Sequence, residues 1–175
     1  MRNVIFASLF LIIACKETKK ENGKSSETEN ISKVNSAETE AAKEWLEKSI
    51  ENYFSADISD QEKIMQNITT KDYYEFKTDA TNVDMDVDGS LSLQDFQKKW
   101  KTKFDVQKAG VGVGFLITGQ DWDKITITKC DAILESENTY LFDVILTDKK
   151  NNANYPIQIS VFKHQNSYLI GDVLQ

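Results

Sequence analysis

The chain has 175 residues, a formal net charge of −7 and 40% hydrophobic residues. This length suggests one domain. The excess of acidic residues argues against the basic surface by which proteins bind nucleic acid or hold on to anionic lipid. We therefore expect no nucleic-acid partner and no electrostatic attachment to a membrane.

Residues 1–15, MRNVIFASLFLIIAC, have basic Arg2 near the start, continue with an apolar stretch and end with small Ala14 before Cys15. A short apolar stretch behind a positive charge predicts a secretory signal, and it is too short to span a bilayer. Residues 12–15, IIAC, resemble the lipobox of bacterial lipoproteins. The resemblance implies a signal peptide over residues 1–14 and lipidation of Cys15. The alternative is an ordinary signal peptide in which Cys15 falls by chance.

Lipidation of Cys15 would attach the protein to the bacterial cell envelope, because two or more acyl chains give lasting membrane attachment. In bacterial lipoproteins an aspartate directly after the lipidated cysteine acts as an inner-membrane retention signal. Lys16 is at that position here, so the resemblance favours the outer membrane. The only other cysteine is Cys130, which would then have no disulfide partner. Its strand-like context, KITITKCDAIL, predicts a small buried residue, not a reactive thiol.

The segment 15–36 is rich in Lys, Glu, Ser, Asn and Thr and almost free of apolar residues. Such a composition cannot bury enough surface to offset the entropy of ordering the chain, so we expect a flexible tether. The folded domain is predicted to cover residues 37–175.

Helical periodicity dominates the first half of this domain. A long helix should start near Ala37, capped by Asn35 or Ser36. A second should begin at a capping box formed by Ser59 and Glu62. The stretches TTKDYYEFKTDA and SLQDFQKKWKTKF predict two further short helices. The side chains expected to be buried in the four helices are Ala42, Trp45, Leu46, Ile50, Tyr53, Phe54, Ile64, Met65, Ile68, Tyr74, Phe76, Leu93, Phe96, Trp100 and Phe104.

The second half is rich in Val, Ile, Thr, Tyr and Phe and predicts strands in VGVGFLIT, DKITITKCDAILE, TYLFDVILTD, ANYPIQISVFKH and SYLIGDVLQ. Apolar and polar residues alternate from Tyr140 to Leu146 and from Tyr155 to Val161, as in an antiparallel sheet with one packed face. Helices followed by strands predict an α+β fold. This order, with the closing hairpin YPIQISVFKHQNSYLIGDVLQ, resembles the NTF2-like (cystatin-like) cone. The resemblance implies N-terminal helices packed on a bent antiparallel sheet.

The run DMDVDGSLSLQD, residues 84–95, resembles an EF-hand calcium loop. Alternating carboxylates supply the hard oxygen ligands that Ca²⁺ prefers, and Gly89 permits the sharp turn. No Lys or Arg occurs between Thr78 and Gln97 to neutralise these carboxylates, which repel one another unless a cation is present. The resemblance implies a set of calcium ligands formed by Asp84, Asp86, Asp88, Ser90, Ser92 and Asp95.

This run also has an interpretation without metal. Ser92 and Asp95 form a pair like a capping box, and the turn dipeptide at Asp88 and Gly89 leads into the helix start. A cap explains nothing upstream of Asp88, so both interpretations stay open. Because the twelfth position is Asp95 where EF-hands have Glu, any calcium should bind weakly and stabilise structure, not act as a signal.

The sequence shows no catalytic constellation. Its single histidine, His164, lies in a predicted turn and has no visible partner to orient it as a general base. NTF2-like enzymes use residues that line the cone, and Asp121, Asp123 or Asp143 could serve, but nothing in the sequence brings them together.

We therefore expect a lipid-anchored, non-catalytic binding or structural lipoprotein with a weak structural calcium site. Its partners would be the membrane, through Cys15, and a small ligand or another envelope protein. One alternative is a small NTF2-like enzyme. The other is a structural or immunity-type lipoprotein with no metal site.

Overall fold

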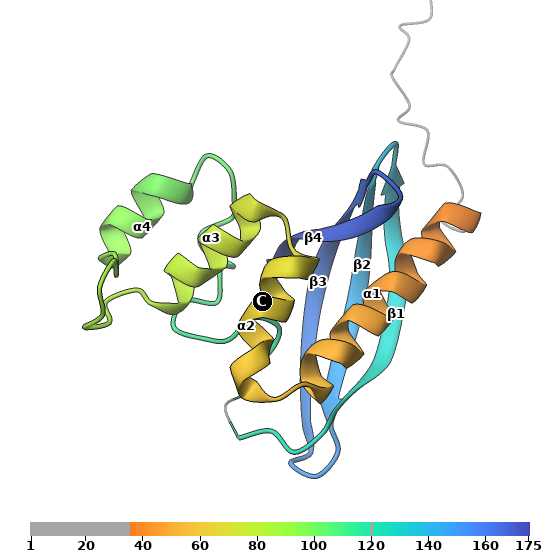
Figure 1. Ribbon diagram of the computed structural model, residues 1–175, viewed down its shortest axis with the longest axis horizontal. Helices are drawn as coiled ribbons and strands as arrows, with labels where there is room; N and C mark the ends of the chain where they lie inside the picture. The colour runs from red at the N-terminus through yellow and green to blue at the C-terminus, as the bar shows by residue number, and fades with distance from the viewer. Residues whose placement is uncertain (1–35, 120) are drawn as a thin grey trace, which may run out of the picture. The chain divides into compact units, whose positions relative to one another are not determined.

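The computed structural model describes residues 36–119 and 121–175. The predicted signal peptide, Cys15 and the tether up to residue 35 lie outside these residues. Four helices precede a four-stranded antiparallel sheet (Figure 1), which confirms the predicted α+β fold. The elements are α1 (Ala37–Ser55), α2 (Ile58–Ile68), α3 (Lys71–Thr81), α4 (Leu93–Trp100), β1 (Ile125–Ser136), β2 (Thr139–Asp148), β3 (Ala153–His164) and β4 (Ser167–Leu174).

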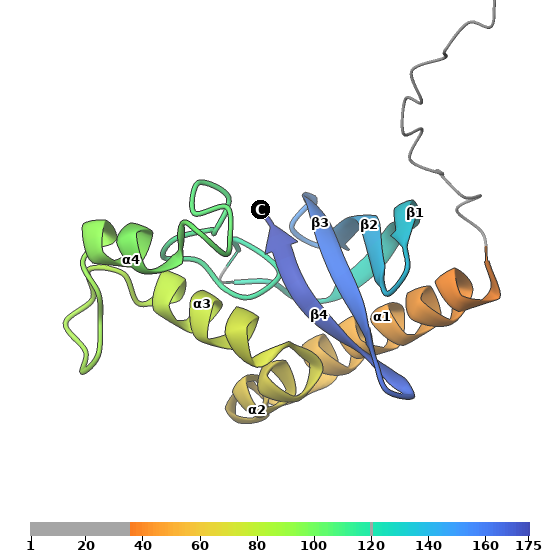
Figure 2. The same ribbon diagram turned by 90° about the horizontal axis from the view of Figure 1, so that it is seen from above.

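The sheet is a meander with the order β1-β2-β3-β4. Along β2, every second side chain from Tyr140 to Asp148 is buried, so the predicted alternation is confirmed. Each of these apolar residues faces one on β3, for example Phe142 opposite Ile159, and both are fully buried. Helix α1 lies across this apolar face (Figures 1 and 2).

Helix α1 begins at Ala37 as predicted, and of the two proposed caps Ser36 is the one observed, because its side chain accepts a hydrogen bond from the Thr39 N–H. A stripe at four-residue spacing, Ala42, Leu46, Ile50 and Phe54, packs into the core. The start of the helix is tied to β1. The Glu135 carboxylate accepts hydrogen bonds from Ser36 Oγ at 2.8 Å and from Thr39 Oγ1 at 2.7 Å.

Helices α2 and α3 differ from the predictions in two details. Helix α2 begins at Ile58 after Asp57, so the predicted capping box was wrong: Ser59 lies inside the helix, and Glu62 instead accepts a hydrogen bond from the Tyr74 hydroxyl at 3.0 Å. In α3 the fully buried tyrosine is Tyr73, which lies on the same face as Phe76 and Ala80.

Helix α4 is capped by Ser92, as predicted, and packs through Phe96 and Trp100. Leu93 does not join this face and is 43% exposed, because it lies at the first helical position, beside the solvent-exposed turn. Phe76 stacks between Phe96 and Phe104, with ring centroids 5.5 and 4.3 Å away, and this aromatic cluster joins α3 to α4.

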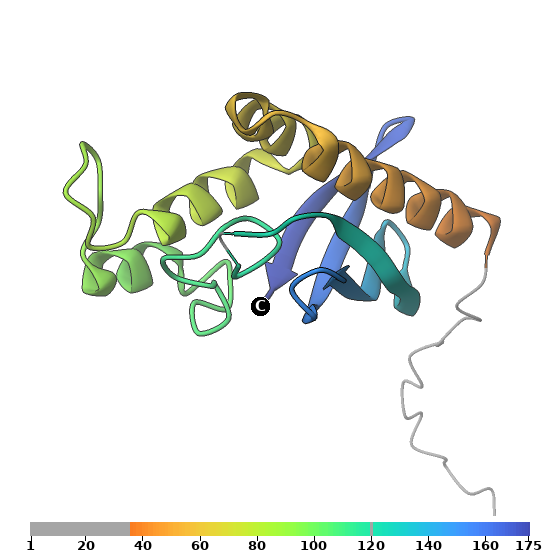
Figure 3. The same cartoon turned by 90° about the horizontal axis from the view of Figure 1, so that it is seen from below.

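The predicted strand VGVGFLIT does not form. Residues 101–119 contain no strand, and Gly110 and Gly112 adopt positive φ angles of +59° and +73°, which break an extended strand. The side chains of residues 115–117 are all buried, so the segment packs against the core without the alternation of a strand. We call residues 109–119 the irregular wall. It runs beside α3 and the C-terminus (Figure 3).

Lys77 holds this wall in place. Its side chain is 1% exposed, and its ammonium group donates to the carbonyls of Ala109 at 2.9 Å and Gly110 at 3.2 Å and to Gln175 Oε1 at 2.7 Å. No carboxylate is among these partners, and burial lowers the pKa of Lys77 to about 8.

Asp148 holds the chain before β1. Its fully buried carboxylate accepts the Asp123 N–H at 2.9 Å, the Lys150 N–H at 3.1 Å and the Asn151 side-chain amide at 2.7 Å. These hydrogen bonds lower the pKa of Asp148, and the one from the Asp123 N–H contributes most to the lowering. Among the described residues, no helix is long and apolar enough to cross a membrane.

Candidate functional site

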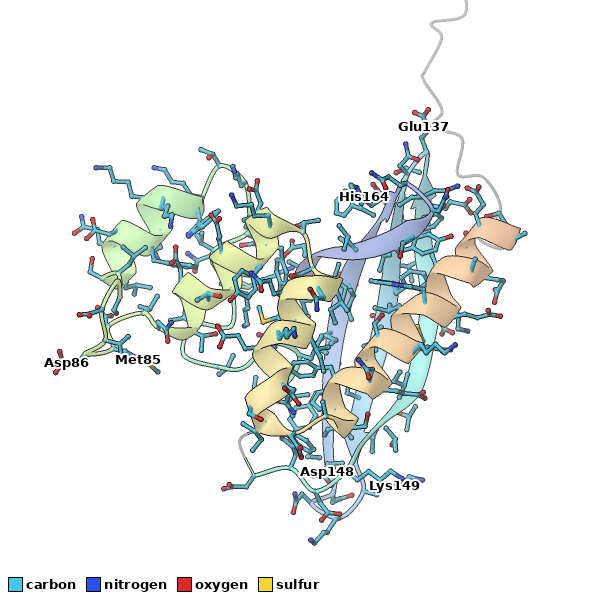
Figure 4. All side chains as sticks on the ribbon, viewed as in Figure 1. Met85, Asp86, Glu137, Asp148, Lys149 and His164 are labelled. Atoms are coloured by element: carbon cyan, nitrogen blue, oxygen red, sulfur yellow. The ribbon has the colours of Figure 1, made fainter. Side chains whose placement is uncertain are left out.

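The acidic loop, residues 82–92, connects α3 to α4 and projects from the end of the domain (Figure 4). Asp84, Asp86 and Asp88 are all exposed. Asp84 has a left-handed φ of 56°, and its N–H donates to the Leu91 carbonyl at 3.0 Å. This bond closes the loop on itself without a cation.

The two serines of the predicted calcium site make bonds inside the loop. Ser90 Oγ donates to the Asn82 carbonyl at 2.5 Å. Ser92 Oγ donates to Asp95 Oδ2 at 2.8 Å and accepts the Asp95 N–H at 3.1 Å. The helix cap predicted for the second half of the run is therefore confirmed.

The side chains of Asp84, Asp86 and Asp88, in the first half of the run, show no such structural role in the described part of the chain. Within residues 36–119 and 121–175, no three or more Asp, Glu, His or Cys side chains come together in a way that could hold a metal ion. For Ca²⁺ to bind, the carboxylates of Asp84, Asp86 and Asp88 would have to turn inward, so calcium binding by this loop stays a prediction.

A groove of about 460 Å³ lies between the acidic loop, the junction of α1 and α2, and the irregular wall. Its sides are apolar and include Tyr53, Phe54, Ile58, Met85, Phe115 and Trp122. The aromatic rings meet edge to face: Tyr53 and Phe115 have centroids 5.2 Å apart, and Phe54 and Trp122 have centroids 5.3 Å apart. Such pairs fix the shape of the groove.

Polar groups in the groove are few. The Thr81 hydroxyl donates to the Val113 carbonyl at 3.0 Å and fastens α3 to the irregular wall. The amide nitrogen Nε2 of Gln61 is buried and has no hydrogen-bond partner among the described residues. Among the groove-lining residues that the structure describes, none is Asp, Glu, His, Lys or Cys.

Carboxylates instead are next in sequence to several of the groove-lining residues. Asp57 precedes Ile58, Asp84 and Asp86 flank Met85, and Asp121 precedes Trp122. All four are exposed, and none forms an ion pair with another described residue. We call these four residues the acidic rim.

The candidate catalytic carboxylates are not brought together. Asp123 pairs with Lys150 at 2.7 Å, whereas Asp143 projects from β2 and pairs with Lys129 at 2.5 Å. Asp121 is exposed, and only its backbone carbonyl is engaged, by the Asn151 side chain.

Cys130 lies buried in a strand, as predicted, whereas His164, predicted in the hairpin turn, is the last residue of β3. His164 is exposed at the end of β3 (Figure 4). Cys130 is buried on β1, and desolvation raises the pKa of its thiol to about 12, so the thiol is protonated and unreactive at neutral pH.

Sequence reasoning missed the groove and the role of Lys77. Isolated apolar residues beside carboxylates, Ile58 after Asp57 and Met85 between two aspartates, were the available signal for the groove. For Lys77 the signal was its position one helical turn after Tyr73, on the buried face of α3.

Comparisons of the chain with protein families, with curated proteins and with solved structures found no match.

Proposed function

We propose that this chain is a lipid-anchored, non-catalytic binding protein of the bacterial cell envelope, and that its groove receives a small ligand or part of another envelope protein. The observation that carries the proposal is the groove itself. It combines apolar walls with a few polar residues, Gln61 and Thr81. Binding sites in proteins share this combination of apolar surface with few polar groups.

The anchoring half of the proposal rests on the sequence. The lipobox ending at Cys15 and the polar segment 15–36 lead directly to Ser36, the cap of α1. The tether would therefore join the domain beside the turn between β1 and β2, because Ser36 contacts Glu135. Lys16 after the cysteine favours the outer membrane.

The non-catalytic half is supported by the distribution of titratable groups. The groove-lining residues described above include no Asp, Glu, His, Lys or Cys. The titratable side chain among them is Tyr53, and burial raises the pKa of its hydroxyl, so it stays protonated at neutral pH. If the fold is an NTF2-like cone, the sheet face toward α1 would be the expected pocket. That face is occupied by fully buried Phe142, Val144, Leu146 and Ile159, which leaves an enzyme little room for substrate.

Anchoring can be tested by membrane fractionation. Cys15→Ser should remove the acylation site and abolish incorporation of radiolabelled palmitate. Cys130→Ser is the matched control, since it replaces the other cysteine, and it should keep the label and the outer-membrane location. A Cys15→Ser chain that is still acylated would contradict the proposal.

The groove can be tested by site-specific photocrosslinking in intact cells. A photoreactive residue at Met85 or Ile58 should give a discrete adduct. The same photoreactive residue at exposed Ile133 on β1 should give none, because Ile133 is no part of the groove lining. The absence of an adduct from both groove positions would overturn the binding function and favour a structural or immunity-type lipoprotein.

A further inference from the structure

We infer that the groove binds a short extended peptide segment of a partner envelope protein, in which apolar side chains alternate with lysine or arginine. This inference rests on the proposed binding function and specifies the ligand. Three features of the groove carry it: its exposed apolar edge, its acidic rim and the open space at Gly112.

The edge of the groove exposes apolar side chains to solvent. Ile58 is 84% exposed and Met85 is 46% exposed, and both line the groove whose floor includes Phe54, Phe115 and Trp122. Exposed aliphatic side chains that continue a concave apolar surface are typical of protein-binding sites. Apolar side chains of a bound segment would occupy the floor and cover both residues.

The charge around the groove selects the sign of the partner. The acidic rim, Asp57, Asp84, Asp86 and Asp121, has no basic partner among the described residues. Exposed carboxylates of this kind attract cations. Lysine or arginine side chains between the apolar residues of the ligand would face this rim and give electrostatic complementarity.

One part of the groove leaves room for a backbone. Gly112 lines the groove and is exposed, and a side chain there would meet nothing within 4 Å, so another backbone can approach closely. An extended peptide segment is thin enough to use this space.

The test uses the mature lipidated protein in phosphatidylcholine nanodiscs, with chelator present, and fluorescein-labelled heptapeptides measured by anisotropy. A peptide of alternating Lys, Leu and Phe, KLKFKLK, should bind. ELEFELE, which reverses the charge, and KSKSKSK, which removes the apolar side chains, should not. Binding of KLKFKLK should weaken as salt rises, because exposed charges are screened.

Variants then localise the site. Asp84→Asn/Asp86→Asn should weaken KLKFKLK binding roughly three- to tenfold, the effect of losing two exposed charge pairs. The matched control Asp131→Asn/Glu137→Gln removes the same charge from β1 and its turn, where Asp131 and Glu137 are exposed, and should leave binding unchanged. Met85→Glu places a charge at the groove edge and should abolish binding without loss of fold, since Met85 is exposed.

Two outcomes would overturn the inference: KLKFKLK binding no more tightly than ELEFELE, or equal weakening in the control variant. An adduct from Met85 in cells combined with no peptide binding would reject the cationic peptide and keep the binding function. If Met85 gives no adduct and KLKFKLK does not bind, both the cationic peptide and the binding function are rejected.

Discussion

Buried side chains recur at every second position along β2 and at every helical turn along α1, whereas residues 115–117 on the groove side are buried in an unbroken row. The sheet part, α1 with β1–β4, is thus held by many equivalent contacts. The groove part, α2–α4 with the acidic loop and residues 101–124, is held by the aromatic cluster between α3 and α4 and by single side chains that reach far along the chain. Lys77, for example, bonds Gln175, 98 residues away.

This difference should appear in stability. Loss of one contact in a repeating pattern weakens the whole cooperative unit, whereas loss of one long-range contact opens only the segment that it holds. A segment that opens locally is also suited to receiving a ligand. We therefore expect the groove part to be the less protected of the two.

The largest effect is expected from Phe76→Ala and Phe142→Ala, one in each part. Both side chains are at most 1% exposed, and truncation of a buried Phe costs about 3–5 kcal/mol. Phe142→Ala should lower amide-exchange protection in all elements. Phe76→Ala removes the ring between Phe96 and Phe104 and should lower protection mainly in α3, α4 and residues 101–119.

Hydrogen exchange followed by mass spectrometry distinguishes these patterns. Equal loss of protection in β2 and β3 for both variants would show that the domain unfolds as one unit, and the comparison between the two parts would fail.

The same difference explains what the sequence could predict. The sheet, the choice of its buried face and the start of α1 follow from local patterns. These patterns are the alternation along β2 and the serine before Ala37. The irregular wall has strand-like composition, yet its glycines adopt positive φ and Lys77 binds two of its carbonyls. Such contacts between distant residues leave no periodic signal. The groove escaped prediction for the same reason, while the cap at Ser92 was visible because it is local.

A smaller effect on the free energy of unfolding is expected from the titration of Lys77. Burial lowers the pKa of Lys77 to about 8, while an unfolded lysine titrates near pH 10.4. Between pH 8 and pH 10 the unfolded state therefore binds more protons at this lysine, so the contribution of Lys77 to the free energy of unfolding should rise with pH by up to about 1 kcal/mol per pH unit. The Cys130 thiol, whose pKa burial raises to about 12, contributes in the opposite direction in both the native chain and the variant. Lys77→Met should lack this contribution and should also expose the irregular wall to faster hydrogen exchange.

Urea denaturation at several pH values measures this contribution. Lys98→Met is the matched control, because Lys98 is exposed on α4, and it should keep the pH dependence of the native chain. Parallel pH profiles for the native chain and Lys77→Met would contradict the prediction.

The smallest effect is expected from Ca²⁺ at the acidic loop, where the structure shows a cap for α4 and no converged set of ligands. Thermal melts of the mature protein in 10 mM Ca²⁺ and in chelator should differ by about 0.4–1.4 kcal/mol if the dissociation constant lies between about 1 and 10 mM. Asp84→Ala/Asp88→Ala should remove the difference, and Asp131→Ala/Glu137→Ala should keep it.

Asp95→Glu sharpens this test. Asp95 now accepts a hydrogen bond from Ser92, and its carboxylate is one methylene shorter than the glutamate that closes an EF-hand loop around calcium in bidentate fashion. If the loop binds Ca²⁺, Asp95→Glu should enlarge the calcium-dependent shift while Ser92 still caps α4. If neither the native chain nor Asp95→Glu responds to 10 mM Ca²⁺, then Asp84, Asp86 and Asp88 are not calcium ligands. Attraction of a basic peptide to the acidic rim would then be the only function proposed for Asp84 and Asp86.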